Sequence, residues 1–350
     1  PVRTLTYGYS ANSAEIRISQ RVAAARGHRA LELVIGPYLI ERLSEVADAI
    51  EGFQGLAFSR QAGVGTEIAS LGDRVVGGHW GDVWFDTAGT HGAPGPVDLV
   101  SVAHHKFAKR GREWLFENLC AEHLDGDPEE VLRQVLAEEL ERIPDLGDPD
   151  MRLKALKTEQ WSFRWTLASV RAYQLAVPTL LPFYANEVVD FFLRVPTERL
   201  PRRRLQMAYL RRHNPDLARI TWQDTGMSLY ERPWEPAASL VRRAVSKGLR
   251  TVRRQRVVER NSDVQYLAPG LGTTLESAEI LHTTTGLPGE QFSTWSLVER
   301  LRSTPGVVAT QTTDSLVTLQ IGLSEHHTKG DGEQQIRATS SSLGSDVSRG

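Results

Sequence analysis

The segment that most constrains this chain runs from residue 75 to residue 86 and reads VVGGHWGDVWFD: a short apolar strand, a glycine-rich turn, an acidic residue and an aromatic segment. Gly77, Gly78 and Gly81 carry no Cβ, so their backbone N–H groups can approach a phosphate closely and can adopt positive φ. Asp82 follows the turn, where a carboxylate can hold a metal ion bound to that phosphate. The alternative is an ordinary strand-end turn whose aspartate caps the next helix.

The residues before this turn predict an α/β domain. Short β-prone runs alternate with amphipathic runs, in the order strand, helix, strand, helix, helix, strand, which is typical of a doubly wound parallel sheet. Ligands of such sheets bind at the carboxyl ends of the strands, where the glycine turn lies. The expected strands are Arg3–Gly8, Leu31–Ile35 and Val75–Val76, and the expected helices run from Ala14 to Gly27, from Tyr38 to Ile50 and from about Thr66.

The residues after the turn have a helical pattern. We therefore expect an α/β domain over residues 1–97, a helical region over 98–323, and a polar tail over 324–350 whose Ser- and Gly-rich composition predicts disorder. The expected helices are Asp98–His123, Pro128–Glu141, Met151–Leu175, a helix that begins near a capping Asn186, Arg202–Arg212, Leu240–Arg260 and Ser293–Arg302.

Composition argues against several classes of partner. The chain has a net charge of −2 and no apolar run as long as the ~18 residues of a membrane span, so neither a membrane nor nucleic acid is expected as a partner. Its single cysteine, Cys120, excludes an intrachain disulfide, fits a reducing cytoplasm and is expected to be a buried thiol. Because the chain opens at Pro1 with strand-like sequence, we expect a fragment that begins inside a domain.

Three motifs, in order, carry a family resemblance. They are TLTYGY with the following SAEIRISQRVAAARGH, then VVGGHWGDVWF, then LPFYANEVVDFFLRVP. Over about residues 3–225 the chain resembles the synthetase domain of asparagine synthetase, with Glu15 and His28 at matching positions. The resemblance implies an adenine-nucleotide-binding, Rossmann-like sheet of the PP-loop ATP pyrophosphatase type. The family's first strand and its pyrophosphate loop would be missing, and so would the glutaminase domain, which predicts that this fragment is inactive.

The chemistry that the resemblance implies is ATP-dependent amide formation. A carboxylate substrate attacks the α-phosphate of ATP, which gives an acyl-adenylate and pyrophosphate, and ammonia, free or drawn from glutamine, then displaces AMP. Mg²⁺ offsets the developing charge. Carried over by position, Tyr7, Gly77 and Gly78 would line the nucleotide, Asp82 would bind the metal, and His79 would stand in place of the family's catalytic glutamate.

The chain also departs from the family pattern. Besides His79, Val83 replaces a second acidic residue, Ala185 replaces an aspartate, and the late lysine is absent from residues 221–230. These departures keep two alternatives open: a non-catalytic relative that acts in binding or assembly, and a ligase of changed substrate. The substrate and the oligomeric state are not predicted.

Other features favour structural interpretations. The basic cluster of residues 242–260 could attract RNA or an anionic membrane, but it has no stacking aromatics and is interpreted as a solvated helix face. Trp161, Phe163 and Trp165 are expected to fill a helical core. The pairs His104-His105 and His326-His327 lack matched ligands at metal-binding spacing.

Overall fold

The computed structural model describes residues 2–230, with gaps at 12, 40, 91–95, 108–115, 118–125 and 223–226, together with residue 265. Over these ranges the protein is mixed α/β and mostly helical, with small parallel sheets, which confirms the expected class in this coarse form. Cys120, the pair His326-His327, and the segments expected at 240–260, 293–302 and 324–350 lie outside the described residues. No described helix is both long enough and apolar enough to cross a membrane.

Two short parallel sheets replace the single sheet that the sequence predicts. β1 (Arg3–Gly8) pairs with β2 (Arg29–Val34), and β3 (Val75–Val76) pairs with β4 (Thr179–Leu180). α1 (Ala14–Ala25) connects β1 to β2, as parallel strands require. Its boundaries follow from the sequence, because the Ser13 side chain accepts the N–H of Ile16 at the first turn and Gly27 leaves the last turn at φ +63°.

The helix expected over residues 38–50 is shorter than predicted. α2 spans Leu43–Ile50, and residues 38, 39, 41 and 42 are not helical. The side-chain oxygen of Gln265 accepts the backbone N–H groups of Tyr38 (3.0 Å) and Leu39 (3.1 Å), and the amide nitrogen of Gln265 donates to the oxygen of Gly36. A side chain more than 200 positions away therefore satisfies the backbone that the local pattern assigned to a helix.

The helix expected at Met151–Leu175 is confirmed, with one irregularity. α9 (Pro149–Lys157) continues through a π-helical segment (Thr158–Thr166) into α10 (Leu167–Gln174). Ser162 and Thr166 are the buried residues of that segment, whereas Phe163 is 62% exposed and Trp165 is 41% exposed. The prediction that these two aromatic residues fill a core was wrong, because the wider π-helical turn directs them outward; Trp161 alone packs against a core.

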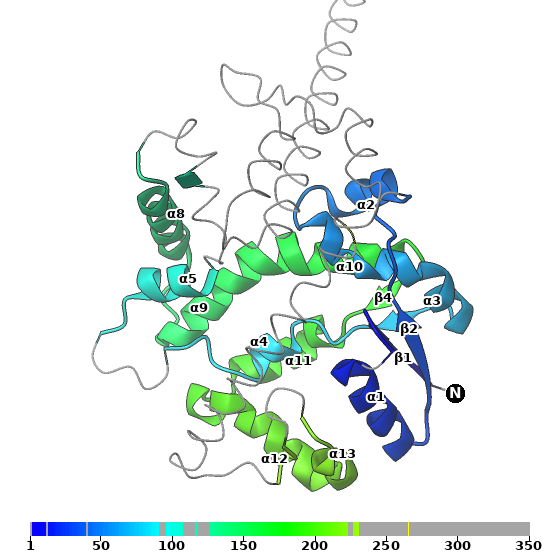
Figure 1. The fold of residues 1–350 in the computed structure, drawn as a ribbon. Coiled ribbons are helices and arrows are strands. Elements are labelled where there is room, and N and C mark those ends of the chain that lie inside the picture. The colour runs from blue at the N-terminus through cyan, green and yellow to red at the C-terminus, as the bar shows by residue number, and fades with distance from the viewer. Residues whose placement is uncertain are drawn as a thin grey trace, which may run out of the picture.

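The composite helix α9–α10 runs across the middle of the molecule, with the strands and α1 at one end and α5 (Leu99–Phe107) and α8 (Pro128–Arg142) at the other (Figure 1). Three buried clusters flank it. The first lies around β2, α2 and α10, the second between α5, α8 and α9, and the third between α4 (Gly81–Trp84) and α11 (Asn186–Leu193). The first cluster contains residues from both sides of position 97.

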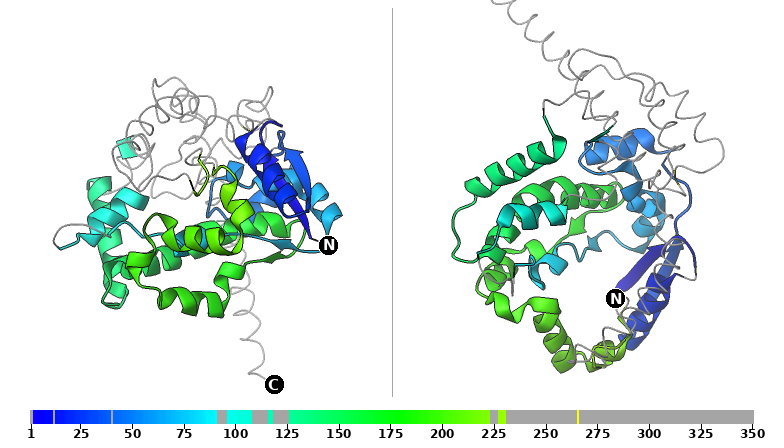
Figure 2. Two further views of the ribbon diagram at one scale, coloured as in Figure 1. Left: turned by 90° about the horizontal axis from the view of Figure 1, so that it is seen from below. Right: turned by 60° about the vertical axis from the view of Figure 1, so that its left-hand side comes forward.

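The remaining described helices are short. They are α3 (Gly65–Leu71), α12 (Arg204–His213), α13 (Pro215–Arg219) and 3-10 helices at Leu56–Phe58, Arg60–Val64, Pro182–Tyr184, Thr197–Arg199 and Pro201–Arg203. Asn186 does not cap α11: it is the first helical residue, and Ala185 holds the cap position without a side-chain hydrogen bond. α13 lies beside α1, so an early and a late element of the described chain are in contact (Figure 2).

Candidate functional site

The glycine turn joins β3 to α4, as the sequence predicts for a strand that enters a helix. Gly77 donates its N–H to the oxygen of Leu180 at 2.9 Å, which extends the β3–β4 pairing into the turn. Asp82 is exposed in the first turn of α4, and no side chain caps that helix. The carboxylate of Asp82 is thus available at the helix start, and the alternative of a capping aspartate does not apply.

The expected positive φ falls on a tryptophan rather than on a glycine. Gly77, Gly78 and Gly81 all have negative or extended φ, whereas Trp80 has φ +73°. Trp80 is only 4% exposed; its ring packs 5.9 Å from that of Tyr184, and the Lys157 ammonium lies 5.5 Å from the ring. Packing in the third cluster holds Trp80 in a conformation that costs about 1–3 kcal/mol.

Each glycine of the turn has a different structural role. A Cβ on Gly81 would lie 2.7 Å from the ring of Phe183, so this glycine is required by packing. A Cβ on Gly77 would lie 2.6 Å from Nδ1 of His79. A Cβ on Gly78 would meet no atom within 4 Å, and Gly78 is exposed. Of the three, Gly78 alone has the open space that a bound phosphate needs.

A hydrogen-bonded group of tyrosines lies at the carboxyl end of β1. The hydroxyl groups of Tyr7 and Tyr173 are 3.1 Å apart, and the Gln61 amide nitrogen donates to the Tyr7 hydroxyl at 3.1 Å. Burial raises the pKa of Tyr173 well above its usual range, and the neighbouring Tyr7 adds to the shift. The Tyr173 hydroxyl therefore stays protonated at neutral pH and serves as a hydrogen-bonding group rather than a base.

Arg60 brings a positive charge to these tyrosines. Burial raises the pKa of Tyr9 above its usual range, while the Arg60 guanidinium, hydrogen-bonded to that hydroxyl, opposes the rise. Three polar atoms here are buried without a hydrogen-bond partner among the described residues: Nε of Arg60, Oε1 of Gln61 and Nδ1 of His79. Buried polar atoms are nearly always paired, so three orphans together indicate a place for a polar ligand.

We call Tyr7, Tyr9, Arg60, Gln61, His79 and Tyr173 the polar cluster. His79 connects it to the glycine turn, because its ring stands edge-on to Tyr173 with centroids 6.2 Å apart. Burial lowers the pKa of His79 below its ordinary value, and the charge of Asp82 partly opposes this. The imidazole is therefore neutral at physiological pH and can accept a proton.

The metal-ligating groups near the turn are few. The described residues contain no group of three His, Cys, Asp or Glu side chains that could enclose a metal ion. Asp82 remains as a single exposed carboxylate. This donor set fits Mg²⁺, which proteins often hold through one or two carboxylates together with the phosphates of a substrate.

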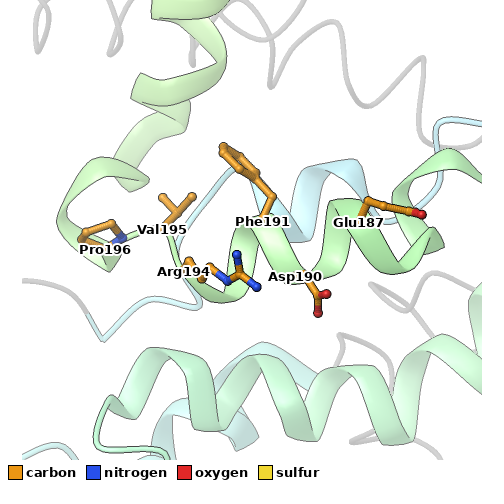
Figure 3. Close-up of a pocket in the computed structure, with 6 residues that line it drawn as sticks. All are labelled: Glu187, Asp190, Phe191, Arg194, Val195 and Pro196. Atoms are coloured by element: carbon orange, nitrogen blue, oxygen red, sulfur yellow. The ribbon is translucent and has the colours of Figure 1, made fainter.

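Two further features lie away from the cluster. His104 bonds through Nε2 to Glu129 at 2.6 Å and so joins α5 to α8, a structural contact. A pocket of about 430 Å³ lies on the outer side of α11 (Figure 3). Its lining contains none of the turn or cluster residues; it consists of Glu187, Asp190, Phe191, Arg194, Val195 and Pro196. We place the candidate site at the polar cluster, since three orphaned buried atoms lie together there.

The sequence-predicted residues are thus only partly brought together. Tyr7 and His79 both belong to the polar cluster, and Gly78 lies one residue before His79. The charge of Asp82 raises the pKa of His79 and so opposes the effect of burial. Arg60, Gln61 and Tyr173 were missed by sequence reasoning. Arg60 and Gln61 fall in a segment that reads as a loop, and Tyr173 reads as one aromatic residue of a long helix.

The chain matches no protein-family model, no curated protein and no solved structure.

Proposed function

We propose that the chain is part of an ATP-dependent amide ligase. This enzyme would activate a carboxylate as an acyl-adenylate and take its nitrogen from glutamine or ammonia. The observation that carries the proposal is the polar cluster, where the orphaned atoms of Arg60, Gln61 and His79 lie beside an open glycine turn at the carboxyl ends of parallel strands. Such strand ends are the usual ligand position in α/β proteins.

The residues present have properties that suit these roles. The Arg60 guanidinium would pair with an anionic group of the ligand, and the open backbone at Gly78 would receive a phosphate oxygen. Asp82 would hold Mg²⁺, which offsets charge on the pyrophosphate. Neutral His79 would accept the proton that the attacking amine releases.

A binding experiment tests the proposal. Calorimetry with ATP and Mg²⁺ should give a saturable isotherm, and Arg60→Gln should weaken it about tenfold or more, since a buried charge-assisted contact is lost. Arg142→Gln, an exposed arginine on α8, is the matched control and should leave the affinity unchanged. Equal binding by the two variants, or no binding by the unaltered chain, would contradict the proposal.

A second candidate is a non-catalytic relative that binds a nucleotide or only keeps the fold. Trp80 and Gly81 favour it, because packing against Tyr184 and Phe183 explains both residues without any ligand. Exchange of pyrophosphate into ATP, assayed with a panel of carboxylates on protein that also carries the family's pyrophosphate loop, separates the two. Exchange with any carboxylate supports the ligase, whereas ATP binding without exchange supports the binding protein.

A further inference from the structure

Residues 194–219 form the most basic described segment of the chain. They contain eight arginines, no lysine and only two acidic residues, which gives a formal charge of +6 in a chain whose net charge is −2. The segment runs from the end of α11 through α12 and α13, which together form the lower edge of the molecule in Figure 1. A nearly neutral protein thus concentrates positive charge at one edge.

Part of this charge has no counter-charge. Arg199, Arg204 and Arg212 are exposed, and their guanidinium groups have no hydrogen-bond or ion-pair partner among the described residues. α12 itself contains no acidic residue. Arg204 and Arg212 lie eight positions apart, about two turns along the same exposed side of the helix.

Two other helices of this chain each pair an arginine with a glutamate. On α8, Arg142 pairs with Glu139 at 2.6 Å, and at the start of α2, Arg42 pairs with Glu45 at 2.5 Å. Such pairs three or four residues apart stabilise a solvated helix. α12 has no acidic residue that could form such a pair, so its exposed arginines are suited to an anionic partner.

Exposed aromatic rings lie among the arginines. Tyr209 is 57% exposed, and its ring lies 4.8 Å from that of His213 on the same helix. Tyr230 is 48% exposed, with the guanidinium groups of Arg211 and Arg219 at 5.8 and 5.9 Å from its ring. Arginine binds phosphate in a fork and stacks on flat rings, and tyrosine stacks on nucleobases.

We propose that this basic surface, made of Arg199, Arg204, Tyr209, Arg212 and His213, binds single-stranded nucleic acid. Tyrosine and arginine also occur together at protein interfaces, but an acidic protein needs only the arginines for charge complementarity. A single strand uses both, because it offers phosphates and unstacked bases. The proposal departs from the expectation drawn from net charge, since the chain average conceals the local excess.

Fluorescence anisotropy with a labelled single-stranded 20-mer, titrated with the whole chain at several salt concentrations, tests the proposal. The double variant Arg204→Gln/Arg212→Gln should weaken binding at least tenfold and lower the slope of log K against log salt by about 1.4, since each phosphate contact of a single strand contributes about 0.7. Tyr209→Ala should weaken binding about tenfold and leave the slope unchanged, because stacking involves no counterion release.

The matched control is Arg133→Gln/Arg142→Gln on α8, which removes the same charge from another exposed helix. The basic cluster at residues 242–260 is unchanged in all variants, so a loss of binding in the α12 variants is attributed to α12 and not to that cluster. Weakening by this control equal to that of the α12 pair would overturn the proposal, as would equal affinity for polyglutamate, equal affinity for a blunt duplex, or no effect of Tyr209→Ala. Circular dichroism confirms that each variant is folded.

Discussion

At the residue scale, His79 is the group of the candidate site whose ordinary pKa lies near neutral pH, and burial lowers that pKa. Because its pKa is lower in the folded chain, the unfolded chain takes up a proton first as the pH falls. The stability associated with neutral His79 is therefore present above the ordinary pKa of about 6.5 and is lost below it. We predict that His79→Gln makes the free energy of unfolding less sensitive to pH below about 6.5, as measured by urea denaturation at a series of pH values.

The same histidine allows a direct test of its neighbour. NMR titration of His79 should give a pKa below the ordinary value, and Asp82→Asn should lower it further, because the Asp82 charge is what opposes the burial effect. A His79 pKa above 6.5, or one that rises in Asp82→Asn, would show that the imidazole is not buried beside this carboxylate.

Gly78 and Gly81 should respond differently to the same substitution. Gly81→Ala forces a Cβ to within 2.7 Å of Phe183 and should destabilise the chain by about 1–3 kcal/mol, since the third cluster must move. Gly78→Ala meets no atom and should leave stability unchanged or raise it by about 0.4–1 kcal/mol. It should nevertheless weaken ATP binding if this backbone receives a phosphate. Thermal unfolding and calorimetry on both variants measure the two effects, and a destabilised Gly78→Ala would contradict this assignment.

At the element scale, the local sequence was enough to predict a helix whose first residues include a capping side chain and a proline. Asp127-Pro128 starts α8 and Asp148-Pro149 starts α9, each with a side-chain cap and a proline in the first turn. α8 begins at the predicted residue, and α9 begins two residues before the expected Met151. The local sequence pattern gave wrong or incomplete predictions where residues distant in the chain determine the local structure. Gln265 prevents the early start of α2, and the hydroxyl groups of Tyr7 and Tyr173 meet across 166 positions. No local pattern indicates such contacts.

The candidate site shows the same division. The strand end, the glycine turn and Asp82 could be predicted because they follow one another in the chain. The positive φ at Trp80 could not, since it depends on packing against Tyr184 and Lys157 from other elements. Arg60 could not either, because its importance comes from the tyrosines that fold around it.

The buried carboxylate of Asp150 joins α9 to the loop before α5 by hydrogen bonds and forms an ion pair within α9. Asp150 is fully buried; its Oδ1 accepts the N–H of Ala88 at 2.6 Å and the hydroxyl of Thr90 at 3.1 Å, and its Oδ2 lies 3.4 Å from the Lys154 ammonium. Burial lowers the pKa of Lys154, and Asp150 opposes this. Asp150 therefore offsets part of the effect of burial on the Lys154 ammonium.

Removing one partner of this pair should be costly. We predict that Asp150→Ala destabilises the chain by about 3–5 kcal/mol in urea denaturation, because an uncompensated charge and two donors stay buried. Asp150→Ala/Lys154→Met should recover part of this loss, since no unpaired charge remains. Asp73→Ala, an exposed aspartate, should change stability by less than about 0.5 kcal/mol. A double variant no more stable than Asp150→Ala would show that the hydrogen bonds, rather than the charge pair, dominate.

At the scale of the whole molecule, the composite helix α9–α10 connects all three buried clusters. Leu153 and Leu156 belong to the second cluster, Trp161 packs against the third, and Ala168 belongs to the first. The π-helical segment lies between the ends of this helix and sets the rotation of one end relative to the other. The three clusters are thus kept in register by a single backbone irregularity.

Deleting the exposed Phe163 tests this dependence. One residue fewer in the π-helical segment would rotate α10 by about 100° and shift it by about 1.5 Å relative to α9. Ala168 would then leave the first cluster, and the buried Val170 and Ala172 would leave their present positions. We predict either loss of folding or two separate thermal transitions, followed by circular dichroism and tryptophan fluorescence. Phe163→Ala, which keeps the length, should change stability by less than about 0.5 kcal/mol. If the deletion variant unfolds in one transition at the unaltered temperature, the clusters do not depend on this register.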